Sequence, residues 1–206
     1  MESTRRQKIN LYFLFVVRTL ITCLLCLTTA QAASPQAFQN GDLVLRRGEG
    51  FFSDIARNFS PNDKRFSHVG IIVTHQQQSH VVHSIHELDK GLDGVVIETL
   101  DAFLTEATDW AIYRLNINKN QQQDFANTAL RYSNKHIPFD SHFDLSSSKA
   151  MYCTEFVWRV SKESIHPNPI KPAVNIGDNL FISIEDIYAH DNISLIESSF
   201  VNHERN

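Results

Sequence analysis

The chain has 206 residues, of which 42% are hydrophobic and 20% are charged, and its formal net charge is −4. This length predicts one globular domain, with at most a short additional segment. The composition excludes a disordered chain, a collagen and a protein with several membrane spans. The negative charge argues against a nucleic-acid binder that relies on a basic surface.

The N-terminal segment 1–32 has the pattern of a secretory signal peptide. A basic head at residues 5–8 precedes an apolar stretch from residue 9 to residue 27, and the small residues Ala30 and Ala32 end the segment. We therefore predict export to the periplasm or the medium, with cleavage near Ala32 and no transmembrane segment in the mature form. The alternative is an uncleaved N-terminal membrane anchor, because the stretch approaches the length that spans a bilayer.

Cleavage would leave Cys153 as the one cysteine of the mature chain, because Cys23 and Cys26 lie in the signal segment. An exported protein with one cysteine cannot form an internal disulfide bond. A buried structural role is the commoner fate of such a thiol. The surroundings of Cys153 must therefore decide between a structural and a chemical role.

Residues 33–206 show no repeat and no domain break, so we predict a single domain there. Short apolar runs bounded by turn residues indicate strands, and apolar residues at helical spacing indicate helices. We expect strands at 42–46, 67–73, 80–85, 95–100 and 111–115, with a further candidate strand at 193–196. Helices are expected at 101–107, 118–135, 151–161 and 184–188, and a short helix or turn at 51–58. This pattern predicts an α+β fold, with an antiparallel sheet packed against helices.

The strands at 67–73 and 80–85 are expected to pair as a hairpin that carries His68 and His83. With an even number of loop residues the two side chains share a face of the sheet, about 4.5 to 8 Å apart. An odd loop would put them on opposite faces. Gly70, on the same face as His68, would leave room for a helix bearing Cys153 to approach.

Cys153 is predicted at the start of a helix, where backbone N–H groups are unpaired and the helix dipole favours negative charge. This position would lower the pKa of the thiol, as a nucleophilic cysteine requires. The same N–H groups could hold an oxyanion in the transition state. Such chemistry needs a histidine as base and a third group that orients the histidine ring.

Five segments carry a resemblance to a known family: G-D-L-V-L at 41–45, S-H-V-G at 67–70, V-V-H-S at 81–84, F-D-S-H-F at 139–143 and Y-C-T-E-F-V-W at 152–158. They resemble the YiiX/YebB-like permuted papain-like amidases of the NlpC superfamily of cell-wall peptidases. The histidine precedes the cysteine, as in the permuted branch. The resemblance covers about residues 41 to 160 and implies a circularly permuted papain-like (NlpC-type) fold, with the nucleophile at a helix N-terminus.

The resemblance implies that Cys153 is the nucleophile and His68 the general base. His83 takes the place of the third, polar residue, which is often a glutamate in this family. A histidine at this place is similar to the second histidine of lecithin–retinol acyltransferase-like members. Tyr152, beside the nucleophile, and Gly70 are candidate substrate-binding residues. Asp140 is a third candidate, which could also brace the helix of Cys153.

The function implied is an exported cysteine hydrolase that cleaves an amide, such as a cell-wall peptide bond, through a Cys-His-His acyl-enzyme mechanism. One alternative is an acyltransferase or thioesterase on lipid-like acyl substrates, and another is a non-catalytic binding module on the same fold. The expected partner is a peptide, amide or acyl-lipid substrate of the cell envelope. Without a phosphate loop, dinucleotide fingerprint or calcium loop in the sequence, we propose no cofactor and no metal.

Overall fold

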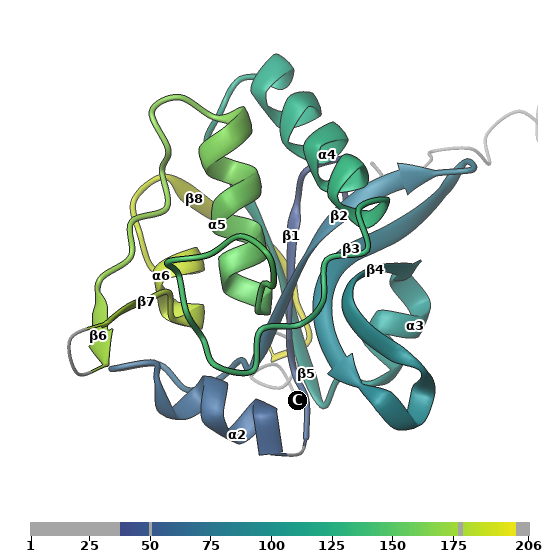
Figure 1. Cartoon of the computed structure of the whole chain (residues 1–206). Helices are drawn as coiled ribbons and strands as arrows, with labels where there is room; N and C mark the ends of the chain where they lie inside the picture. The colour runs from purple at the N-terminus through teal and green to yellow at the C-terminus, as the bar shows by residue number, and fades with distance from the viewer. Residues whose placement is uncertain (1–37, 50, 177–178, 201–206) are drawn as a thin grey trace, which may run out of the picture. The chain divides into compact units, whose positions relative to one another are not determined.

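A six-stranded antiparallel sheet organises this computed structural model (Figure 1). The structure describes residues 38–49, 51–176 and 179–200. The chain divides into two units, Met1–Gln36 and Ala37–Asn206, and all the helices and strands given below belong to the second. The predicted signal peptide, residues 1–32, lies outside the described residues. Within the described part, no helix has the length and apolar character needed to cross a membrane.

The strands of the main sheet follow the order β4-β3-β2-β1-β5-β8. They are β1 (Leu43–Arg47), β2 (His68–His75), β3 (Gln78–Glu87), β4 (Leu92–Thr99), β5 (Asp109–Leu115) and β8 (Ile193–Ser198). The helices are α2 (Phe51–Asn58), α3 (Leu100–Thr105), α4 (Lys119–Ser133), α5 (Cys153–Ser164) and α6 (Ile184–Tyr188). Each of these elements confirms a prediction from the sequence to within a few residues. The sequence did not predict the 3-10 turn η1 (Leu88–Lys90) or the two-stranded sheet of β6 (Val174–Ile176) and β7 (Asn179–Phe181).

The two faces of the sheet bury separate apolar clusters. Val69 and Ile71 of β2 pack with Phe156 of α5 in the larger cluster, which also includes residues of α4. Ile72 of β2 lies in the smaller cluster with Phe103 of α3. Figure 1 shows α4 and α5 on one side of the sheet and α3 on the other. Because side chains alternate along a strand, His68 belongs to the α3 face of β2.

The hairpin between β2 and β3 brings the two predicted histidines together. Its turn is the two-residue pair Gln76-Gln77, with φ of 49° and 65°. The loop is therefore even, and the register pairs Ile71 with Val82. His68 and His83 consequently lie diagonally on one face, as the even-loop prediction requires.

Gly94, within β4, lies against the backbone of Ile137 and Pro138. Its φ is +85°, and a Cβ there would lie 2.0 Å from the carbonyl oxygen of Ile137. The adjacent Val95 N–H donates to that same oxygen at 2.8 Å. Only glycine fits this close backbone approach.

We expect Gly94→Ala to lower the free energy of unfolding by about 3 kcal/mol, through left-handed strain and a backbone clash together. Gly91→Ala is the matched control, because Gly91 has φ +70° but nothing within 4 Å of the added Cβ. It should cost about 1 kcal/mol, from strain alone. Urea unfolding of both variants measures the difference, and equal losses would contradict the role assigned to the Ile137 contact.

Candidate active site

Three hydrogen bonds fix the N-terminus of α5, which carries Cys153. Ser84 Oγ on β3 donates to the Met151 carbonyl at 2.5 Å. Thr154 Oγ1 donates to the Ile182 carbonyl at 2.6 Å, and the Ile182 N–H donates to the Tyr152 hydroxyl at 3.1 Å. The helix start is thus held by the sheet on one side and by the segment before α6 on the other.

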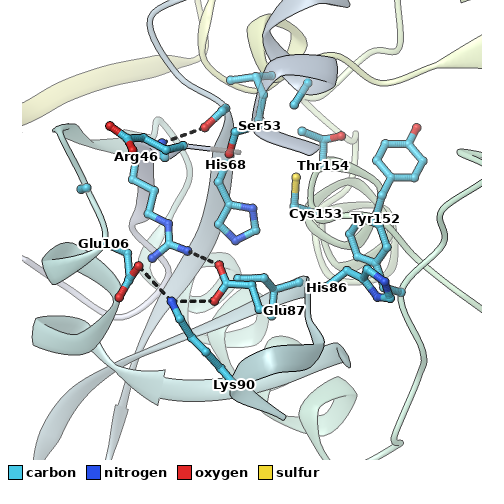
Figure 2. A pocket seen from close by; sticks show the side chains of 18 of the residues that line it. Arg46, Ser53, His68, His86, Glu87, Lys90, Glu106, Tyr152, Cys153 and Thr154 are labelled. Atoms are coloured by element: carbon cyan, nitrogen blue, oxygen red, sulfur yellow. Dashed lines mark hydrogen bonds and ion pairs between the residues drawn. The ribbon is translucent and has the colours of Figure 1, made fainter. Parts of the chain in front are cut away.

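Cys153 is 8% exposed, and Figure 2 shows its side chain in the same pocket as the His68 ring. Burial raises the pKa of the thiol to about 11, although backbone N–H groups of Val69 and Thr154 act in the opposite direction. The sequence analysis expected a lowered pKa from the helix start. That expectation was wrong because desolvation outweighs the N–H groups and the dipole. The thiol is therefore protonated at neutral pH, and the site needs a base.

His68 is the base that the geometry offers. Its Nε2 lies 2.8 Å from Nδ1 of His83, which leaves Nδ1 of His68 as the nitrogen that can meet the sulfur. The ring stacks on Phe103 with centroids 5.7 Å apart. Burial, and then the charge of Arg46 and the neighbouring His83, hold the pKa of His68 well below its usual value. His68 is accordingly neutral at physiological pH and able to accept a proton.

His83 connects His68 to a carboxylate. It is fully buried, and its Nε2 lies 2.9 Å from Oε1 of Glu98 on β4. The two atoms face each other closely, although the contact does not meet the geometric criteria of a hydrogen bond. Burial lowers the pKa of His83, and the Glu98 carboxylate opposes that shift. A row of three side chains therefore runs from His68 across the sheet to Glu98.

Arg46 lies directly opposite His68 in the register of β1 and β2. It is 4% exposed, its Nη1 donates to the Phe103 carbonyl at 2.7 Å, and its Cζ lies 4.4 Å from the centroid of the Phe103 ring. Its Nη2 lies 3.7 Å from Glu87, which also pairs with Lys90 at 3.0 Å. Figure 2 shows this charged group beside His68.

Cys153 and His68 both line a pocket of about 700 Å³. Its lining includes two chemically different sets of side chains, named here the apolar wall and the charged wall. The apolar wall comprises Ile85, Phe139, Phe143, Tyr152, Phe181 and Ile184. The charged wall comprises Arg46, Glu49, Glu87, Asp89, Lys90 and Glu106. In Figure 2, Tyr152 lies on the Cys153 side, whereas Arg46 and Glu106 lie beyond His68.

The other predicted site residues have different places. Tyr152 lines the pocket, but its hydroxyl is engaged by Ile182. Gly70 does not line the pocket, because the space beside it is filled by Val81 and His83 of the neighbouring strand, with a built Cβ 2.3 Å from Val81 Cγ1. The expected approach of α5 at Gly70 was therefore wrong: α5 packs on the other face.

Asp140 also lies outside the pocket lining, and it braces a loop instead of the helix of Cys153. Its carboxylate accepts the N–H groups of His142 at 2.9 Å and Asp144 at 2.6 Å. This fixes the turn that presents Phe139 and Phe143 to the pocket. Asp140 thus stabilises the loop that carries part of the apolar wall, without lining the pocket itself.

Glu155, on the first turn of α5, fastens the same loop through Arg159. Its Oε1 accepts Nε of Arg159 at 2.6 Å, and Arg159 Nη2 donates to the Leu145 and Ser147 carbonyls at 3.0 and 2.6 Å. Glu155 is fully buried, and Oε2 has no hydrogen-bond partner among the described residues. Burial raises its pKa from 4.5 to about 7, against the charge of Arg159.

Because the folded state holds this proton more tightly than the unfolded state, stability should fall as pH rises from about 4.5 to about 7. We expect Glu155→Gln to match the wild type at pH 4 and to exceed it by about 3 kcal/mol at pH 8. Urea unfolding at the two pH values measures this difference. Glu163→Gln, on the same helix but exposed, should bring no such gain, and a pH-independent effect of Glu155→Gln would contradict the account.

Comparison with known proteins identifies the group to which this site belongs. A family model described as permuted papain-like amidase enzyme, YaeF/YiiX, C92 family, matches residues 37–176. The chain belongs to this family. The match confirms the resemblance inferred from the sequence motifs, and the C92 family supports a cysteine-dependent amidase as the general class.

The fold of the C92 family is also found in a solved structure. The crystal structure of metalloprotein yiiX from Escherichia coli O157:H7 is similar to this chain, with a TM-score of 0.64 and 17% sequence identity. The similarity covers 78% of this chain and 97% of that one. The predicted α+β, permuted papain-like fold is thereby confirmed. A search of the curated proteins returns no match to this chain.

Proposed function

We propose that this protein is an exported cysteine hydrolase that cleaves an amide through a Cys-His-His acyl-enzyme mechanism. The observation that carries the proposal is that Cys153, at the start of α5, and His68 line one pocket, with His68 tied to His83. Membership of the permuted papain-like amidases supports the reaction class. A peptide, amide or acyl-lipid of the cell envelope is the expected substrate.

In the first step, Nδ1 of His68 takes the thiol proton as the sulfur of Cys153 attacks the carbonyl carbon. The amide C–N bond then breaks, and the same proton passes from His68 to the departing amine. In the second step, a water molecule attacks the acyl carbon through its oxygen, and His68 takes a proton from this water. The C–S bond breaks, the acid departs, and the proton returns to the sulfur.

The start of α5 supplies donors for the oxyanion that forms in both steps. Tyr152, the N-cap residue, makes no side-chain capping hydrogen bond, so the first backbone N–H groups of the helix keep their donor capacity. The N–H groups of Cys153 and Thr154 already favour negative charge on the sulfur. An oxyanion at the attacked carbon would lie beside the same donors.

An acyltransferase or thioesterase is the second candidate function. The apolar wall formed by Phe139, Phe143 and Phe181 favours it, because this wall suits an acyl chain. The sulfur chemistry is the same: an acyltransferase passes the acyl group to an alcohol or amine, and a thioesterase passes it from a thioester to water. A non-catalytic binding module is the third candidate function, and such a protein would turn over no substrate.

A substrate panel tests these functions against one another. The protein is assayed with fluorogenic peptide amides and with acyl thioesters of graded chain length, each with Cys153→Ala beside the wild type. Cysteine-dependent amide cleavage supports the proposed hydrolase. Preference for long-chain thioesters, or transfer to an added amine, supports the second candidate. Absence of cysteine-dependent turnover across the panel overturns both enzymatic functions.

Export of the protein has its own test. The basic head, apolar stretch and Ala30-Gln31-Ala32 of the N-terminal segment support cleavage after Ala32. We expect N-terminal sequencing of the protein from the envelope or medium to begin at Ala33. A start at Met1 on the exported protein would instead support the uncleaved membrane anchor.

The proposed mechanism routes no step through a metal ion. The similar E. coli protein is called a metalloprotein in its title. In the part of this chain that the structure describes, no group of three or more His, Cys, Asp or Glu side chains could hold a metal ion. The residues present do not fit such a group, so every proton transfer proposed above uses the side chains of the chain itself.

A further inference from the structure

We propose that Glu98 is a positioning residue that fixes the tautomers of His83 and His68, so that the lone pair of His68 Nδ1 faces the sulfur. This inference rests on the proposed function for the role of His68. Sequence motifs did not point to Glu98, which lies on β4, a different strand from either histidine.

Glu98 stands at the end of a continuous row of side chains across three strands. It lies opposite Val81 in the register of β3 and β4, on the same face as His83. Its Oε1 is 2.9 Å from His83 Nε2, and His83 Nδ1 is 2.8 Å from His68 Nε2. The Glu98 side chain is 19% exposed, whereas His83 is fully buried.

The chemistry of the groups in this row decides where the protons lie. A carboxylate has only lone pairs to offer, so the facing Nε2 of His83 must carry a hydrogen. A neutral His83 then has its lone pair on Nδ1 and accepts the Nε2–H of His68. That leaves the lone pair of His68 on Nδ1, the nitrogen available to Cys153.

With the opposite pair of tautomers, His83 would be repelled by Glu98 and His68 could not act as the base. It would set a lone pair of His83 Nε2 against the carboxylate of Glu98 at 2.9 Å. It would also place a hydrogen on His68 Nδ1, which could not then accept the thiol proton. Glu98 therefore selects the reactive arrangement through His83, without touching the reacting atoms.

The surrounding packing restricts the rings to this arrangement. Phe103 of α3 stacks on His68 and meets His83 edge-on, with centroids 5.7 and 5.2 Å away. Arg46, over the same Phe103 ring, is a fixed cation near both histidines, and it disfavours a second positive charge there. Glu98 and the more distant Glu87 are the opposing charges that act on His83. When His68 takes the thiol proton, a polarised His83 can stabilise the imidazolium.

The test combines nitrogen-15 NMR of the histidine rings with kinetics on wild type, Glu98→Gln and Asp101→Asn. Asp101, exposed on α3, is the matched control for loss of one carboxylate. We expect the wild-type spectrum to place hydrogens on Nε2 of both His68 and His83. In Glu98→Gln, whose amide can donate, a mixture of tautomers should appear. Its kcat should fall about 10- to 100-fold while KM changes little, as is typical for outer partners of reactive groups.

Two results would overturn the proposal: a hydrogen on His68 Nδ1 in the wild type, or tautomers and kcat in Glu98→Gln equal to those of Asp101→Asn. The wild-type spectrum requires no variant, so the test stands even if Glu98→Gln does not fold. It also separates the two proposals. A wild type with the expected tautomers but no turnover would refute the proposed function and leave the positioning by Glu98 supported.

Discussion

Cys153→Ala is expected to reduce turnover of any amide or thioester substrate by on the order of 10⁴-fold or more, because removal of the nucleophile leaves only binding and the oxyanion donors. Cys153 lines the pocket together with His68, and its sulfur is the nucleophile that forms the acyl bond in the proposed mechanism. KM should change little, since the thiol contributes little to binding. Steady-state kinetics with the best substrate of the panel gives both constants.

The control for this variant is its stability. Cys153 is a small buried side chain, so the change to alanine should cost about 1 kcal/mol and leave the fold intact. Urea unfolding and the circular dichroism spectrum verify this. Full activity in a folded Cys153→Ala protein would refute the acyl-enzyme mechanism.

His68→Ala is expected to lower kcat by about 10²- to 10⁴-fold, the usual contribution of a general base. The thiol has a pKa of about 11 and therefore does not ionise by itself at neutral pH. In the wild type, burial and Arg46 hold the pKa of His68 well below 6.5, so activity should persist as pH falls through 6.5. In His68→Ala, the remaining activity should instead rise with pH toward the pKa of the thiol.

His80→Ala is the matched control, because His80 lies on the same hairpin but outside the pocket lining. Its ring contacts only His75 and the Gln78 carbonyl among the contacts of the described residues. The activity and pH profile of this variant should equal those of the wild type. Equal kinetics for His68→Ala and His80→Ala would remove His68 from the mechanism.

The sequence was sufficient to predict the elements that carry Cys153, His68 and His83. Apolar periodicity located the strands and helices, and the order of the motifs indicated the permuted fold. The parity of the hairpin loop was left open, because Gln76-Gln77 lacks the Asn-Gly or Asp-Gly signature of a two-residue turn. Strand register, which is a property of the folded sheet, decided this point.

The residues that support the histidines could not be predicted in the same way. Arg46 meets His68 only through the pairing of β1 with β2, and Glu98 reaches His83 only through the pairing of β3 with β4. The expected approach of α5 at Gly70 was wrong for a related reason. Gly70 shares a face of β2 with His68, and this face lies away from α5. Cys153 and His68 come together in the pocket, which Gly70 does not line.

The thiol pKa shows a second limit of sequence reasoning. A helix start predicts stabilisation of a thiolate, yet the direction of the shift depends on how much water remains around Cys153. At 8% exposure, desolvation dominates. The loop that contributes Phe139 and Phe143 to the pocket has no periodic pattern, and its shape depends on Asp140 and Arg159.

Trapping the covalent intermediate tests the central claim most directly. Wild-type protein is mixed with its best substrate, quenched in acid within the first turnover, and analysed by intact mass and peptide mapping. We predict an added mass equal to the acyl group, located on the peptide that contains Cys153, with formation and decay rates that account for kcat. Turnover without acylation at position 153, or with the acyl group on another side chain, would contradict the account.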